Sequence, residues 1–177
     1  MKKFLLPVIA GFLFVSCGES AQEAPEAEAP AAPEPVFASP IGYSSKFEMG
    51  NSKYSEMVAQ LWKDFDDNKL DANASYFADS IVMDLPNWRF NGTRDSLLAV
   101  TKQYRNDLEG VKSSIDAIMS VKSTDVGDDW VLIWGREYIT KGEKIDSSGV
   151  HEAWRFNKSG KIDWVMQFRQ AYPEPQK

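Results

Sequence analysis

The sequence predicts an α+β domain, in which helices cover one face of an antiparallel β-sheet. Three observations support this fold class. Amphipathic helical stripes occupy the first half of the domain, a period of two begins at Val111, and tight turns separate three long strands after Asp129. Hydrophobic residues make up 43% of the chain and aromatic residues 12%, which is enough apolar surface for a folded core.

The N-terminal segment, residues 1–16, has the form of a secretory signal peptide. Lys2-Lys3 precedes an apolar run, Phe4–Val15, that is shorter than the roughly 20 residues a membrane-spanning helix needs. The run leads into Phe14–Cys17, which resembles the lipobox of bacterial lipoproteins, with phenylalanine where leucine is more usual. A lipid on Cys17 would anchor the protein to a membrane of the bacterial cell envelope, on the periplasmic or the cell-surface side. The alternative is an ordinary cleaved signal with an incidental cysteine.

Residues 17–42 are expected to form a disordered tether. Alanine, proline and glutamate dominate this stretch, which has too few apolar side chains to offset the entropy of ordering. The folded domain is expected over 43–177, which carries 18 basic and 21 acidic residues. A weakly acidic domain is a poor binder of phosphate backbones, so nucleic acid is not an expected partner.

The first helix is expected from about Lys53 to Asn68. Ser52 is the predicted N-cap, and Glu56 lies close to the capping-box position. Apolar residues recur on one face of this helix: Tyr54, Met57, Val58, Leu61, Trp62 and Phe65.

Two further helices are expected. A short one covers about Asp71–Phe77, with Asp71 as its cap, and a longer one covers about Arg94–Leu108, with Thr93 as its N-cap. Gly110 is well placed to terminate the longer helix.

The remaining segments are predicted strands. Ser80–Leu85 is followed by the breaker Pro86-Asn87, and Trp88–Asn91 can pair with the strand before it. Residues alternate between apolar and polar over Val111–Lys122. Three long strands joined by tight turns follow, over Trp130–Thr140, Ile145–Phe156 and Lys161–Arg169.

This order of elements, together with three local phrases, resembles the NTF2-like superfamily, which includes SnoaL-like polyketide cyclases and ketosteroid isomerases. The phrases are YFADSIVMD over Tyr76–Asp84, FNG over Phe90–Gly92 and WRFNKSGKI over Trp154–Ile162. The resemblance implies a cystatin-like α+β cone: a strongly curved antiparallel sheet wraps around the N-terminal helix, two further helices complete it, and a ligand pocket opens at one end. It also implies a possible homodimer through the outer face of the sheet.

The resemblance carries over few catalytic residues. The catalytic tyrosine of ketosteroid isomerases falls at Leu61, and their general-base aspartate falls at Leu85, one residue after Asp84. The second acid, which donates a hydrogen bond to an oxyanion, falls at Glu152. Only one of these three positions keeps a residue of the same chemical type, which argues against isomerase chemistry.

Glu152 is the first candidate site residue. On a regular strand it shares a face with Val150 and Trp154, and an apolar pocket there would raise its pKa, as suits a general acid or a hydrogen-bond donor. The alternative is a structural ion pair with a nearby arginine such as Arg169 or Arg136.

His151 and Asp84 are the other catalytic candidates. His151 is adjacent to Glu152 and faces the opposite way, so it is either a base or a packing and interface residue. Asp84 is either a pocket acid or an aspartate that caps the turn before Pro86.

Trp62, Trp88, Trp154 and Arg169 are the candidate ligand-binding residues. One histidine and one cysteine leave no expected transition-metal cluster. The sequence has no glycine-rich phosphate loop and no G-x-S-x-G nucleophile elbow, and no cofactor is expected.

Three functions remain open from the sequence. The leading hypothesis is a membrane-tethered module that binds a small, largely apolar ligand or acts as an accessory subunit. The second is a SnoaL-like acid/base enzyme of cyclase, isomerase or hydrolase type, which needs at least two of Glu152, Asp84 and His151 in one pocket. The third is a structural dimeric module whose cone is filled.

Overall fold

The computed structural model describes residues 35–171, so the predicted signal peptide, Cys17 and most of the predicted tether lie outside the described residues. The described residues from 39 to 171 form one compact unit, which holds every described helix and strand. Because the hydrophobic core also lies within it, this unit has the organisation of an independently folding domain. None of the helices within residues 35–171 is long and apolar enough to span a membrane.

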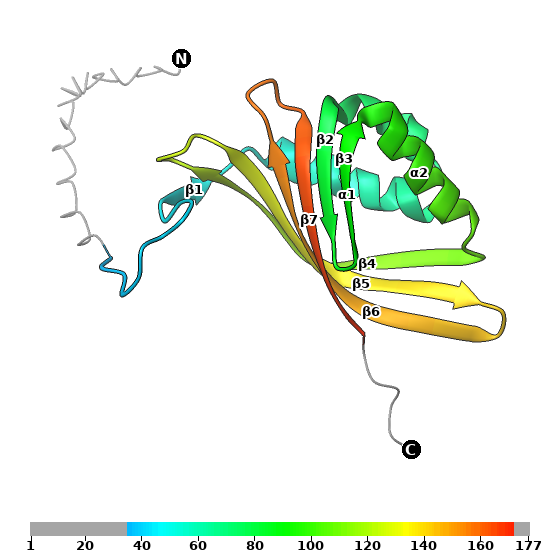
Figure 1. The fold of residues 1–177 in the computed structure, drawn as a ribbon. Helices are drawn as coiled ribbons and strands as arrows, with labels where there is room; N and C mark the ends of the chain where they lie inside the picture. The colour runs from blue at the N-terminus through cyan, green and yellow to red at the C-terminus, as the bar shows by residue number, and fades with distance from the viewer. Residues whose placement is uncertain (1–34, 172–177) are drawn as a thin grey trace, which may run out of the picture. The chain divides into compact units, whose positions relative to one another are not determined.

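A single curled, unclosed sheet of seven strands dominates the fold (Figure 1). Its spatial order is β1-β4-β5-β6-β7-β2-β3. The bounds are β1 Phe47–Met49, β2 Phe77–Leu85, β3 Trp88–Thr93, β4 Gly110–Ser123, β5 Asp129–Lys141, β6 Lys144–Phe156 and β7 Ile162–Ala171. The four predicted strands after residue 110 are confirmed as an antiparallel series, and the pairing of β2 with β3 is also confirmed.

Two features of the sheet differ from the expectation. The pairing of β2 with β7 is parallel, whereas the sequence predicts an antiparallel sheet. The strand β1, which pairs antiparallel with β4, is an addition that the sequence pattern does not predict.

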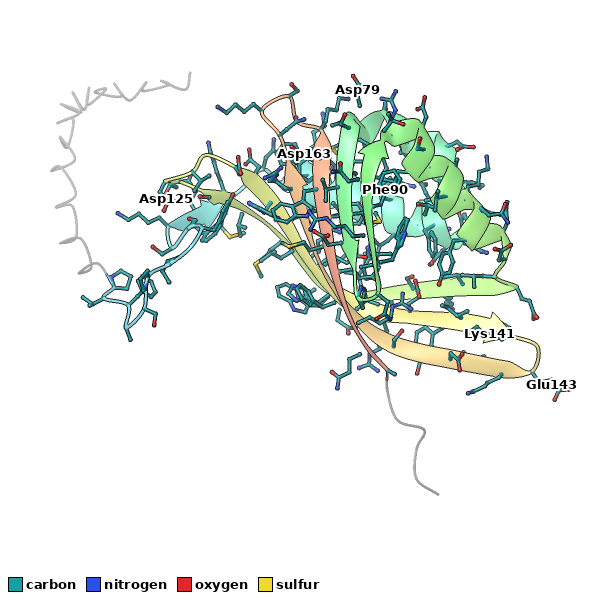
Figure 2. All side chains as sticks on the ribbon, viewed as in Figure 1. Asp79, Phe90, Asp125, Lys141, Glu143 and Asp163 are labelled. Carbon is teal, nitrogen blue, oxygen red and sulfur yellow. The ribbon has the colours of Figure 1, made fainter. Side chains whose placement is uncertain are left out.

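Asp125 and Lys141, labelled in Figure 2, mark the turns at the two ends of β5.

Three helical segments accompany the sheet: α1 Ser52–Asp66, the 3₁₀ helix η1 Leu70–Tyr76, and α2 Arg94–Asn106. Figure 1 shows α1 and α2 on the same side of the curled sheet. The short helix is held to α1 because Asn73 donates a hydrogen bond to Asp64 at 2.6 Å. The sequence predicts that Asp71 caps η1, but this prediction was wrong. Asp71 instead forms an ion pair with Lys102 of α2.

Both long helices begin at a polar N-cap. The side chain of Asn51 accepts a hydrogen bond from the backbone N–H of Lys53 at 3.0 Å, so Asn51 caps α1 and the prediction of Ser52 was wrong by one residue. Thr93 is confirmed as the cap of α2, since its hydroxyl accepts from the backbone N–H of Ser96 at 3.3 Å.

The ends of the two helices are fastened to each other and to β4. Arg105 of α2 donates to the backbone carbonyls of Phe65 and Asp66 at 2.7 and 2.9 Å, which satisfies carbonyls at the end of α1. The carboxylate of Asp66 accepts from the backbone N–H and the hydroxyl of Ser113. Gly110, predicted to terminate α2, instead begins β4.

The core lies between the helices and the inner face of the sheet. Its fully buried side chains include Val58, Ile81, Leu97, Val131, Ile133, Phe156, Ile162 and Val165. Each such side chain contributes about 1.5–3 kcal/mol relative to exposure. Consecutive strand residues point to opposite faces of the sheet. The buried core residues therefore show which positions of β5, β6 and β7 face inward.

Candidate functional site

A cavity of about 630 Å³ opens between the helices and the inner face of the sheet. Most of its lining is aliphatic or aromatic, and its rings include Trp62, Phe65, Phe77, Trp88, Tyr104 and Trp154. Trp88 and Tyr104 are 40% and 50% exposed, whereas Phe77 and Trp154 are buried. The first two therefore lie toward the mouth of the cavity and the last two toward its interior.

Glu152 is the buried acid of this cavity, with 6% of its surface exposed. Its Oε2 accepts hydrogen bonds from the indole N–H of Trp62 at 2.6 Å and of Trp154 at 2.9 Å. Its Oε1 accepts from the amide of Gln167 at 2.7 Å. Helix α1 and strands β6 and β7 thus each supply a donor to one carboxyl group.

The position of Trp62 depends on a glycine in β5. A Cβ placed on Gly135 would lie 2.7 Å from the six-membered ring of Trp62 and 2.3 Å from the backbone oxygen of Ser114. Any larger residue at position 135 would displace the indole that donates to Glu152. Gly135 therefore allows the side chain of Trp62 to lie directly against the backbone of β5.

Burial raises the pKa of Glu152 above its ordinary value, because the charged form loses its hydration. The three N–H donors, from Gln167, Trp62 and Trp154, act in the opposite direction. The negative charge of Glu137 raises the pKa further. Within residues 35–171, no basic side chain is paired with Glu152.

Glu137 is a second acid of the cavity, which the sequence prediction missed. It lies on the inner face of β5 with 8% of its surface exposed. The guanidinium of Arg169 on β7 donates to its carboxylate at 2.5 Å. The sequence allowed an ion pair between Glu152 and an arginine, but Arg169 pairs with Glu137, and Arg136 lies 3.6 Å from Asp116.

Asp84 lies on the outer face of the sheet. It accepts a hydrogen bond from the indole of Trp164 at 2.8 Å, and its carboxylate is 3.3 Å from the guanidinium of Arg89. In the parallel pair of β2 with β7 it stands beside Met166, which lines a groove on that outer face.

His151 also lies on the outer face. Its ring stacks on Trp134, with centroids 4.8 Å apart and planes inclined by 12°, and Phe168 flanks it at 6.1 Å. The Nε2 atom is buried and makes no hydrogen bond to any residue that the structure describes. The three candidate catalytic residues are therefore divided, with Glu152 on the inner face and Asp84 and His151 on the outer face.

The structure brings three of the four candidate ligand-binding residues into the cavity lining. Trp62, Trp88 and Trp154 line it, whereas Arg169 only supports it through Glu137. Gln167 is a further polar lining residue that the sequence prediction missed. Strand alternation was the available signal for both missed residues. Glu137 is an even number of residues from Val131 and Ile133, and Gln167 is two residues from Val165, so each faces the same side of the sheet as these core residues. No group of three or more metal-ligating side chains gathers within residues 35–171.

Comparison with solved structures identifies the fold. An NTF2-like protein of unknown function from Cytophaga hutchinsonii superposes with a TM-score of 0.51 at 13% identity, over 66% of this chain and 99% of that one. The domain has the NTF2-like fold. Neither the protein-family models nor the curated proteins include a match to this chain.

Two further solved structures with a similar fold have different descriptions. A LEH-like epoxide hydrolase from M. tuberculosis has a TM-score of 0.56 at 12% identity, covering 67% of this chain and 84% of that one. A SnoaL-like protein of unknown function from Burkholderia thailandensis has a TM-score of 0.53 at 16% identity, covering 70% and 99%. Likeness at such identities shows the fold alone, so the function must be argued from the cavity.

Proposed function

We propose that this NTF2-like domain binds a small, largely apolar molecule in the cavity between its helices and its sheet. The observation that carries the proposal is the cavity itself: about 630 Å³, lined mainly by apolar side chains, with a few polar groups around the buried Glu152. Binding sites for small molecules have this size and this composition. A filled cone, the third hypothesis, would leave no such space.

The geometry supports binding ahead of acid/base catalysis. The enzyme hypothesis needs two of Glu152, Asp84 and His151 in one pocket, and the sheet separates Glu152 from the other two. A general base must lie within hydrogen-bond reach of the proton it abstracts. Neither Asp84 nor His151 lines the cavity, so neither can act on a molecule held there beside Glu152.

We also propose that the domain is tethered to a membrane of the bacterial cell envelope through a lipid on Cys17. The support is the signal-like start of the chain and the lipobox-like phrase before its single cysteine. Growth with a radiolabelled fatty acid should label the wild-type protein, and Cys17→Ser should abolish the label. Equal labelling of both proteins would contradict the tether.

A direct binding assay with a fluorescent probe tests the binding proposal. A neutral fluorescent probe of naphthalene size should bind residues 39–177 and show energy transfer from the tryptophans of the cavity. Leu98, which lines the cavity from α2, is replaced by tryptophan to fill part of the space. The variant should weaken probe binding about tenfold or more, since the site depends on free volume.

Val126→Trp is the matched control. Val126 lies in the exposed turn between β4 and β5, outside the cavity lining, so the same residue added there should leave probe affinity unchanged. Equal affinities for wild type and Leu98→Trp, or equal losses in both variants, would overturn the proposed site.

A further inference from the structure

The hydrogen bonds around Glu152 are arranged for a carboxylate that accepts. Trp62, Trp154 and Gln167 all donate to it, and no described group accepts from it. Two of these bonds end on Oε2 and one on Oε1. A carboxylate has about four acceptor positions, so one position on Oε1 remains for a donor that enters the cavity.

The charged side chains that line the cavity are all acidic. Of the described side chains that line it, the charged ones are Glu137 and Glu152. Arg169 neutralises Glu137, whereas Glu152 has neutral N–H donors and no cation paired with it. A bound cation would compensate the charged form of Glu152, whereas a bound anion would bring a negative charge that no described side chain of the lining compensates.

The rings of the lining suit a cation with an apolar body. Trp62, Trp88 and Trp154 line the cavity together with Phe65, Phe77 and Tyr104. The faces of aromatic rings attract ammonium groups, and burial of an attached hydrocarbon chain adds to the affinity.

We infer that the cavity selects apolar amines, with the ammonium group of the ligand donating to Oε1 of Glu152 while its hydrocarbon body lies among the aromatic side chains. This inference rests on the proposed binding function and names the ligand class of the same site. A ligand with only a carbonyl acceptor would need Glu152 to be a protonated donor. The three N–H groups directed at the carboxyl and the ammonium group of an amine all favour its charged form, against the effect of burial, which raises its pKa.

Three decyl compounds of equal chain length test the inference on residues 39–177. Decylamine, decanol and decanoate are titrated separately at neutral pH, below the concentrations at which they aggregate, and their affinities are measured by calorimetry. Decylamine should bind about tenfold tighter than decanol or better, because a hydrogen bond between an ammonium group and a carboxylate is stronger than one between neutral groups. Decanoate should bind most weakly.

Two variants with the same change of charge locate the effect. Glu152→Gln should remove the preference of decylamine over decanol, whereas Asp84→Asn, on the outer face, should retain it. Circular dichroism confirms that each variant is folded, and the comparison of the three ligands on the wild-type domain stands without either variant.

The outcomes separate the two proposals. If decanol binds the wild-type domain as tightly as decylamine, the amine preference is overturned and the binding function stands. If Glu152→Gln keeps the preference, the amine is held by surface charge and the inference fails. If none of the three compounds binds, the proposed function and the inference fail together.

Discussion

At the scale of single residues, Glu152 decides the character of the cavity. Its carboxyl is almost fully buried, which raises its pKa, and three N–H donors partly restore the stability of its charged form. Burial without these donors would leave an acid that is simply protonated. The result is a buried group whose protonation responds to pH and to whatever enters the cavity.

This pKa shift predicts how stability depends on pH. Between the unfolded value of 4.5 and the raised folded value, the folded protein binds more protons at Glu152 than the unfolded chain does. The contribution of Glu152 is therefore most favourable below about pH 4.5 and is lost as the pH rises through the folded pKa. Glu152→Gln should remove this loss of stability. Because only one group titrates, the free energy of unfolding can change by at most about 1.4 kcal/mol per pH unit.

Urea midpoints of wild type and Glu152→Gln from pH 5 to 8 measure that difference. All other titrating groups are common to the two proteins, so the difference isolates position 152. Asp67, Asp125 and Asp146 have lowered pKa values, and their own contributions change only in more acidic solution, below about 3.8. A stability difference that does not change with pH would contradict the shift.

Gly135 carries the second prediction at this scale. Gly135→Ala should cost about 1–3 kcal/mol of unfolding free energy, because its Cβ would overlap the ring of Trp62 and the backbone of Ser114. Gly42→Ala is the matched control, since a Cβ at Gly42 meets no atom within 4 Å. Urea unfolding measures both, and equal stability of the two variants would show that Gly135 is not a packing requirement.

At the scale of elements, the start of α1 is a direct test of the fold. Asn51→Ala should destabilise the domain by about 1 kcal/mol, because the variant loses the side-chain acceptor for the backbone N–H of Lys53. Ser52→Ala should have little effect, since Ser52 is already within the helix. Thermal unfolding of both variants measures the difference, and a larger loss in Ser52→Ala would reverse the assignment of the cap.

The predictable elements are those with a local signal. Periods of two and of 3.6 residues predict β4–β7, α1 and α2, because each period follows from the geometry of one segment. The strand β1 is only three residues long, which is too short for its alternation to predict a strand. The parallel pairing of β2 with β7 joins segments far apart in sequence, so it depends on tertiary packing and leaves no local pattern.

The candidate site shows the same limit. Strand alternation places Glu152 with Val150 and Trp154 on one face, and the structure has all three in the cavity lining. Alternation cannot assign partners, so the pairing of Arg169 with Glu137 could not be read from the chain. The approach of Trp62 to Glu152 depends on how α1 packs against β5, which no local pattern contains.

At the scale of the whole molecule, the outer face of the sheet carries an apolar surface. Phe168 and Phe47 are 63% and 50% exposed there, and the buried Nε2 of His151 lacks a described partner. We propose that this face forms a homodimer, since exposed apolar patches mark association sites. Phe168→Glu should give a monomer in sedimentation velocity experiments, and Val126→Glu, in the β4–β5 turn, should not. A wild-type monomer at micromolar concentration would contradict the dimer.

The central claim is that the inner cavity holds a small apolar molecule. The most direct measurement is a crystal structure of residues 39–177 soaked with 1-bromonaphthalene, in which anomalous scattering locates the bromine. The account predicts a bromine in the cavity, against the rings of Trp88 or Trp154. A cavity closed by its own side chains, or a bromine only in the outer groove beside Trp130 and Trp164, would contradict it.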